Sequence, residues 1–183
     1  MPEDGKAVTV RRWAGVGWAV LLLTWAGDAC MSFATETGPV APKPLYRDPV
    51  YDGAADPVLV WNRREGKWCM FYTNRRANVA GLPGVSWVHG TRIGVAESPD
   101  RGATWKYRGT ADLPIGGDED THWAPDIVFH EGTYHMFLTF VPGTHDDWSG
   151  ERRIAHLTSP DLVTWKKVGQ LPFASDRVLD ASV

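Results

Sequence analysis

The segment Lys67-Trp-Cys-Met-Phe-Tyr-Thr73 occurs again as Thr133-Tyr-His-Met-Phe-Leu-Thr139, and the sequence around each copy repeats with it. Ser98-Pro-Asp100 returns as Ser159-Pro-Asp161, and a Thr-Trp-Lys segment follows a few residues later in both copies. Each copy contains four short apolar runs that are separated by polar turns. A repeat of this length with four strands per copy is typical of the blades of a β-propeller.

The repeat sets the expected organisation of residues 51–183. We expect blade one over residues 54–108, blade two over residues 123–168 and the first strand of a third blade over residues 177–183. The strands predicted within the two blades are residues 56–61, 67–73, 92–97 and 104–108, then 126–130, 133–141, 153–158 and 164–168. Since a propeller ring closes with about four blades or more, we expect the chain to be the N-terminal part of a longer protein. Two open blades would leave unpaired edges that hinder independent folding.

The N-terminal residues have a different composition. An apolar run over residues 13–29 follows Arg11 and Arg12, and it has the length of the hydrophobic region of a secretory signal. We interpret residues 1–30 as a signal peptide or N-terminal anchor, with lipid attachment at Cys30 as an alternative, and residues 31–50 as a linker. These features predict a secreted, periplasmic or cell-surface protein. The net charge of −3 favours neither nucleic acid nor an anionic membrane as a partner.

Strand direction assigns the loops to two faces of the propeller. Because the strands of a blade alternate in direction, the long connections over residues 74–91, 109–125, 142–152 and 169–179 share the face at which each first strand begins. The short turns lie on the opposite face. Long loops on one face of a rigid scaffold are where binding sites usually occur. We therefore expect a functional site on the face of the long loops, which we call the loop face.

Three aspartates stand at or before the start of a first strand. They are Asp56, Asp126 and Asp180, and we interpret their positions as equivalent in the repeat. Carboxylates that lie close together shift one another's pKa values, which can provide both a base and an orienting group. The alternative is that each aspartate caps a strand or ties down a neighbouring loop. The equivalence of the three positions favours a functional cluster.

The turns on the opposite face carry a second aspartate pattern. Ser98-Pro-Asp-Arg-Gly-Ala-Thr-Trp105 fits the pattern known as an Asp box, and residues 159–165 are a shorter relative of it. Ser and Asp side chains in such turns bind backbone amides of the turn itself. We therefore expect structural roles for Asp100 and Asp161. We also expect Cys69 to be a buried core residue.

Several of these segments together resemble a known family. Ala54-Ala-Asp-Pro57, His122-Trp-Ala-Pro-Asp126 and Ser159-Pro-Asp-Leu162 are similar to segments of five-bladed propeller glycosidases, in the group around glycoside hydrolase family 43 and the related family 117. The resemblance implies an all-β, five-bladed β-propeller of which this chain holds two four-stranded blades and the first strand of a third. It also implies an O-glycosyl hydrolase that acts on poly- or oligosaccharides by inversion.

The resemblance also implies roles for single residues. Asp56 takes the role of the general base, and Asp126 takes that of the aspartate that tunes and orients the general acid. Family 43 uses a glutamate from the third blade as that acid, and family 117 is thought to use a histidine from later in its chain. Neither acid can be assigned within residues 1–183, so we expect this fragment to be inactive by itself.

Further side chains on the loop face could contact a sugar. We predict substrate contacts for Asp180, Arg75, Trp87, His89, His122 and Trp123. Simple loop salt bridges remain the alternative for the arginines of this face. We expect no cofactor and no catalytic metal, because Asp118-Glu-Asp120 resembles a solvated loop more than a calcium site. Two other functions stay open: a carbohydrate-binding propeller without catalysis, and a sialidase-type propeller, for which the characteristic arginine triad is not visible.

Overall fold

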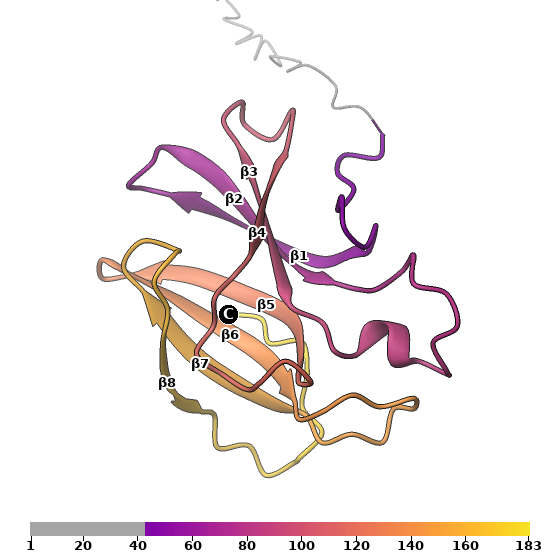
Figure 1. Ribbon diagram of the computed structural model, residues 1–183. Helices are drawn as coiled ribbons and strands as arrows, with labels where there is room; N and C mark the ends of the chain where they lie inside the picture. The colour runs from indigo at the N-terminus through magenta and orange to yellow at the C-terminus, as the bar shows by residue number, and fades with distance from the viewer. Residues whose placement is uncertain (1–42) are drawn as a thin grey trace, which may run out of the picture. The chain divides into compact units, whose positions relative to one another are not determined.

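The computed structural model describes residues 43–183, and these residues form two four-stranded antiparallel sheets (Figure 1). Blade one contains β1 (Ala54–Asn62), β2 (Lys67–Asn74), β3 (Ile93–Ser98) and β4 (Lys106–Thr110). Blade two contains β5 (Thr121–His130), β6 (Thr133–Val141), β7 (Arg153–Ser159) and β8 (Lys166–Gln170). In both sheets the strands pair in the order in which they occur along the chain. A short 3-10 helix, η1 (Ser86–Val88), lies in the loop between β2 and β3.

The two sheets confirm the all-β prediction and the expected division into two blades. The strands also differ from the predicted ranges at some of their ends. β1 and β5 begin before the expected residues 56 and 126, and β4 and β8 begin after residues 104 and 164. The signal or anchor segment and most of the linker predicted for residues 31–50 lie outside the described residues. Within residues 43–183, no helix is long and apolar enough to cross a membrane.

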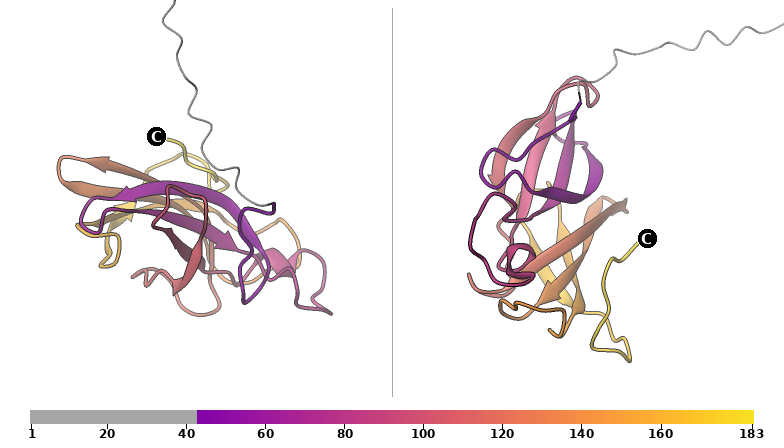
Figure 2. Two further views of the ribbon diagram at one scale, coloured as in Figure 1. Left: turned by 90° about the horizontal axis from the view of Figure 1, so that it is seen from above. Right: turned by 90° about the vertical axis from the view of Figure 1, so that its right-hand side faces the viewer.

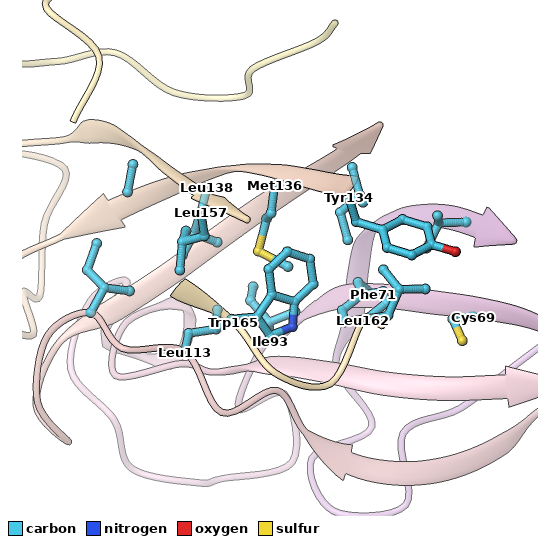
Figure 3. Close-up of a cluster of buried hydrophobic side chains, with 14 residues drawn as sticks. Cys69, Phe71, Ile93, Leu113, Tyr134, Met136, Leu138, Leu157, Leu162 and Trp165 are labelled. Atoms are coloured by element: carbon cyan, nitrogen blue, oxygen red, sulfur yellow. The ribbon is translucent and has the colours of Figure 1, made fainter. Parts of the chain in front are cut away.

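The core lies between the two blades (Figure 3). Phe71 of β2 and Met136 of β6 are completely buried there, and Trp165 contacts Phe71 edge-on with 6.1 Å between ring centroids. These are the apolar positions of the sequence repeat, which the alternation along a strand turns toward the neighbouring sheet. The hydroxyl of Tyr134 also donates to the carbonyl of Trp61 at 3.0 Å, which joins blade two to the end of β1. Cys69 is buried in the same core, as predicted.

The turns on the opposite face have the structural roles predicted for Asp100 and Asp161. Asp100 accepts hydrogen bonds from the amide and the hydroxyl of Thr104, and these bonds lower the pKa of Asp100 to about 2. Asp161 accepts the amide of Thr164 at 2.7 Å. Each carboxylate closes its own turn. This also explains why β4 and β8 begin after the Thr-Trp pair, because these threonines belong to the turn.

The register of the strands corrects the interpretation of the three aspartates. Val58 pairs with Phe71 in blade one, and Asp126 pairs with Phe137 in blade two. Since Phe71 and Phe137 are equivalent in the repeat, Asp126 corresponds to Val58 and not to Asp56. The blade-two residue that corresponds to Asp56 is Ala124.

Two hydrogen bonds between successive copies of the repeat support this correction. The amide of Ala124 donates to Thr73 Oγ1 at 2.8 Å, and the amide of Asp180 donates to Thr139 Oγ1 at 3.0 Å. Thr73 and Thr139 are equivalent residues at the ends of β2 and β6. Asp56, Ala124 and Asp180 also share a left-handed backbone, with φ of 48°, 41° and 56°. Asp56 and Asp180 are therefore equivalent, and Asp126 lies two residues further along its strand.

The third copy of the repeat does not form a regular strand in this structure. Residues 177–183 contribute a single parallel bridge between Arg177 and Arg152. In blades one and two, the first strand pairs with the second strand of its own sheet. Residues 177–183 have no such neighbour in the described part of the chain. They run instead beside blade two, where Figure 1 shows the C-terminus next to β5 and β6, and Figure 2 shows the segment from two further directions.

Candidate active site

A pocket of about 340 Å³ opens on the loop face, as the analysis of strand direction predicted. Its walls come from the start of β1, the loop between β2 and β3, the start of β5, the loop between β6 and β7, and the segment after β8. The lining residues are Asp56, Arg75, Trp87, Val88, Trp123, Trp148, Arg152, Leu179 and Asp180. The pocket therefore brings together five of the eight predicted site residues, namely Asp56, Arg75, Trp87, Trp123 and Asp180.

An ion pair holds the carboxylate of Asp56 at one end of the pocket. Arg75 Nη2 lies 2.8 Å from Asp56 Oδ2, and both side chains are partly exposed. The backbone brings the two residues together, because the amide of Arg75 donates to the carbonyl of Gly53 at 2.9 Å. A Cβ atom on Gly53 would lie 1.7 Å from the carbonyl oxygen of Arg75, so only glycine allows this close approach. The Gly53 position thus supports the placement of Asp56 and Arg75.

Asp180 lies near Asp56 in the same part of the pocket. Burial raises the pKa of Asp180, the negative charge of Asp56 adds to this, and the positive charge of Arg75 opposes it. Asp180 therefore keeps its proton to a higher pH than a free aspartate, whereas Asp56 accepts a hydrogen bond from a guanidinium. The pocket thus holds two neighbouring carboxyl groups in different surroundings.

Three tryptophans form the aromatic part of the pocket. Trp123 is 9% exposed, and its Nε1 donates to the carbonyl of Val88 at 2.6 Å, which fixes the ring. Trp148 lies 6.1 Å from Trp123 between ring centroids and is 55% exposed, and Trp87 is 38% exposed. Flat aromatic surfaces of this kind present a large apolar area to a ligand at a low cost in conformational entropy. The arrangement suits a ring-shaped ligand.

His89 and His122 are placed differently from the prediction of direct substrate contact. His89 is 1% exposed and packs beneath the pocket against Trp123, with 4.8 Å between ring centroids. His122 is 2% exposed, and its Nε2 lies 3.1 Å from the carbonyl oxygen of Ile115. Burial lowers the pKa of each histidine to about 4, so both rings are neutral at pH 7. Neither histidine is among the residues that line the pocket.

Asp126 is half-buried and lies beside the pocket rather than in its wall. Its Oδ2 accepts the amide of Val183 at 2.8 Å. The offset of two residues from Ala124 explains this position, since the equivalent of Asp56 in blade two carries only a methyl group. The catalytic role assigned to Asp126 from the resemblance stays a prediction.

Four pocket residues were missed by the sequence analysis: Val88 and Leu179 are apolar, and the other two are Trp148 and Arg152. The last two come from the loop over residues 142–152, which strand direction correctly assigned to the loop face. The signal that could have identified Trp148 is an aromatic residue within the polar segment Asp146-Asp-Trp-Ser-Gly150. Arg152 is one of two successive arginines, and the sequence does not indicate which of them faces the pocket.

The described residues contain no group of three histidine, cysteine or acidic side chains arranged to hold a metal ion. Within Asp118-Glu-Asp120, Asp118 contacts Arg92 at 3.3 Å. Asp120 accepts the amides of Gly117 and Gly143, both at 2.7 Å. Asp120 therefore ties two loops together through its carboxylate, and these amides lower its pKa.

No family model and no curated protein matches the sequence. Solved structures are similar in fold. A protein from Parabacteroides distasonis assigned as a glycoside hydrolase has a TM-score of 0.51 and 20% identity over 72% of this chain and 41% of its own. A family 117 glycoside hydrolase from Zobellia galactanivorans has a TM-score of 0.45 and 26% identity, over 70% of this chain and 42% of that one. An arabinanase from Bacillus subtilis has a TM-score of 0.43 and 17% identity, over 67% and 39%.

This chain thus spans about two fifths of the length of each of these three structures. Together with the two four-stranded sheets, the likeness to the Parabacteroides protein shows the fold, which is part of a β-propeller.

Proposed function

We propose that this chain is part of a glycosidase that hydrolyses glycosidic bonds in poly- or oligosaccharides, with inversion at the anomeric carbon. The observation that carries the proposal is the pocket on the loop face, in which two carboxyl groups adjoin a wall of three tryptophans. Hydrolysis of a glycosidic bond needs carboxyl groups beside the bond and a surface that holds the sugar ring. The pocket offers both within one hollow. The apolar run over residues 13–29 makes export the proposed setting.

In this proposal Asp56 is the general base. Its carboxylate would accept a proton from the water that attacks the anomeric carbon on the face opposite to the leaving group. Arg75 would keep the carboxylate in one orientation through the 2.8 Å contact. Water then adds to the sugar, and the glycosidic oxygen leaves with a proton from a general acid. By the resemblance to families 43 and 117, this acid lies beyond residue 183, and Asp126 would orient it.

The tryptophans would bind the sugar ring. Trp123 is fixed by its hydrogen bond to Val88, so it can provide a rigid surface at the bottom of the pocket. Trp87 and Trp148 are more exposed and would contact the ring from the sides. Asp180 would accept hydrogen bonds from sugar hydroxyls.

A carbohydrate-binding propeller without catalysis is the second candidate. The observation that favours it is the ion pair between Asp56 and Arg75, since a carboxylate held in an ion pair can serve binding alone. The sialidase-type alternative has less support, because the Asp-box turns close through their own side chains on the face opposite to the pocket.

The test is a screen of the longer protein that we expect to contain this chain against arabino-, xylo- and agaro-oligosaccharides, with proton NMR of the freshly released sugar. We expect hydrolysis of at least one series, with the anomer opposite in configuration to the cleaved bond appearing first. Release of the same anomer as in the substrate would contradict the inverting mechanism. Binding without any hydrolysis would replace the enzyme by the carbohydrate-binding candidate.

A further inference from the structure

Arg152 is the cation in the pocket wall that lacks a carboxylate partner among residues 43–183. It stands directly before β7, and its Nη2 donates to the carbonyl of Trp148 at 3.2 Å. Its Nε is buried, and no hydrogen-bond acceptor within the described residues reaches it. The other pocket arginine differs, since Arg75 contacts Asp56 at 2.8 Å. The adjacent arginine on the strand, Arg153, also has a partner in Glu151.

Apolar and uncharged side chains are among the neighbours of Arg152. Trp148 and Trp123 form the adjacent wall, and His89 beneath them is uncharged at pH 7 because burial lowers its pKa to about 4. A charge next to apolar surface loses part of its hydration, so that a counter-ion there gains more than in open water. Arg152 can therefore bind an anion that residues 43–183 do not supply.

The wall of the pocket carries charges of both signs. Asp56 and Arg75 form an ion pair there, and Asp180 lies near Asp56. Arg152 belongs to the same wall, where its guanidinium donates to the carbonyl of Trp148. A ligand in the pocket would meet both carboxyl groups and the guanidinium of Arg152.

We infer that the pocket takes an anionic saccharide, whose carboxylate or sulfate group binds the guanidinium of Arg152. This inference rests on the proposed function, because it assigns a class of substrate to the same pocket. The guanidinium presents N–H donors in a planar fork, which matches the oxygens of both anionic groups. The sugar ring would lie on Trp123 and Trp148, with the glycosidic bond to be cleaved toward Asp56.

The experiment compares the binding of three ligands of similar size to the protein that contains this chain. They are trigalacturonate, a sulfated galactose trisaccharide and neutral galactotriose, and binding is followed by tryptophan fluorescence at low salt. We expect at least one anionic ligand to bind about ten-fold or more tightly than the neutral one, as loss of one charged hydrogen-bonded contact would predict. The carboxylate and sulfate arms identify which anionic group is preferred.

The variants assign the preference to one side chain. Arg152→Met should reduce the affinity for the anionic ligand to that for galactotriose, and Arg152→Lys should keep part of the preference because it keeps the charge. Arg153→Met is the matched control, since Arg153 pairs with Glu151 outside the pocket, and it should leave the preference unchanged.

The outcomes separate this inference from the proposed function. Equal affinities for the neutral and anionic ligands, or a preference that survives Arg152→Met, would overturn the anionic class and leave a neutral saccharide as the substrate. Failure of all three ligands and of the neutral oligosaccharide series to bind would contradict the saccharide site itself. If Arg152→Met does not fold, Arg152→Lys takes its place: a reduced preference for the anionic ligand would support the inference, and a preference as large as that of wild type would overturn it.

Discussion

Replacing Asp56 by Asn is expected to lower hydrolysis by the longer protein by roughly two to four orders of magnitude, the contribution typical of a general base. The amide of Asn cannot take a proton from the attacking water. It keeps the size of the side chain and an oxygen that accepts a hydrogen bond from Arg75, so the pocket should keep its shape. The backbone should not be strained either, because Asn tolerates the left-handed conformation found at this position, with φ of 48°. Initial rates on the preferred oligosaccharide measure the effect.

Asp100→Asn is the matched control for this prediction. It makes the same chemical change at an aspartate of the opposite face, where the carboxylate closes its own turn. We expect turnover within a few-fold of wild type, even if the turn is somewhat less stable. Turnover of Asp56→Asn close to that of wild type, with circular dichroism showing a normal fold for both variants, would contradict the role of Asp56 as the base.

Lowering the pH from 6.5 toward 4 is expected to reduce the free energy of unfolding through His89 and His122. Burial lowers the pKa of both from 6.5 to about 4. Between these values the unfolded chain binds protons that the folded chain does not, so stability rises with pH across this window and falls on acidification. A difference of this size corresponds to at most about 3 kcal/mol for each histidine. Urea unfolding at pH 7, 6, 5 and 4 would measure the loss.

The variant His122→Gln removes one of the two buried histidines and tests its share of this pH dependence. This variant should lose less stability between pH 6.5 and 5 than wild type, because one of the two buried histidines with a pKa of about 4 has been removed. His130→Gln, at a histidine whose side chain is exposed, should follow the wild-type dependence on pH. If the free energy of unfolding changes equally with pH in His122→Gln and in wild type, His122 does not have the lowered pKa that its burial implies.

The blades were predictable from the sequence because a blade is a local unit. Its strands follow one another along the chain, and residues that repeat, such as Met70 and Met136, are buried in both blades. The loop face was predictable for the same reason, since strand direction alone decides the end at which each loop lies. The limits of the strands were less accurate, because the Asp-box turns use threonines that strand patterns also favour.

The equivalence of the three aspartates was wrong because the motifs were aligned on the carboxylates. Asp56 precedes Pro57, whereas Asp126 follows Pro125. Aligned on the prolines, the sequences already pair Asp56 with Ala124, as the strand register does. The order of Asp and Pro therefore indicated the correct alignment. Each first strand has a β-bulge at this point, and the strand pairing of the two blades is equivalent before and after the bulge.

The residues that line the pocket could be predicted only in part. Asp56, Arg75, Trp87, Trp123 and Asp180 were predicted as site residues of the loop face and line one pocket there, while their roles stay predictions. Whether a loop side chain points outward or packs inward depends on contacts between distant segments, and these are absent from the local pattern. His89 illustrates this, because Trp123 from the following blade covers it. Arg152 reaches the pocket while its neighbour Arg153 pairs with Glu151.

A second aromatic surface could bind a saccharide in place of the pocket on the loop face. Trp61, Trp68 and Trp105 line a hollow together with Leu59, Arg101 and Gly102, at the Asp-box turn of blade one. This hollow contains no carboxyl group, so it could hold a sugar by stacking but offers no base for hydrolysis. If saccharides bound there, the assignment of the loop face as the functional face would be wrong.

The measurement that distinguishes the two surfaces is a titration with the preferred oligosaccharide, followed through the indole N–H resonances of the protein and assigned by single Trp→Phe variants. We predict shifts for Trp87, Trp123 and Trp148 that saturate together, while the resonances of Trp61, Trp68 and Trp105 stay in place. Saturating shifts confined to Trp61, Trp68 and Trp105 would contradict the account.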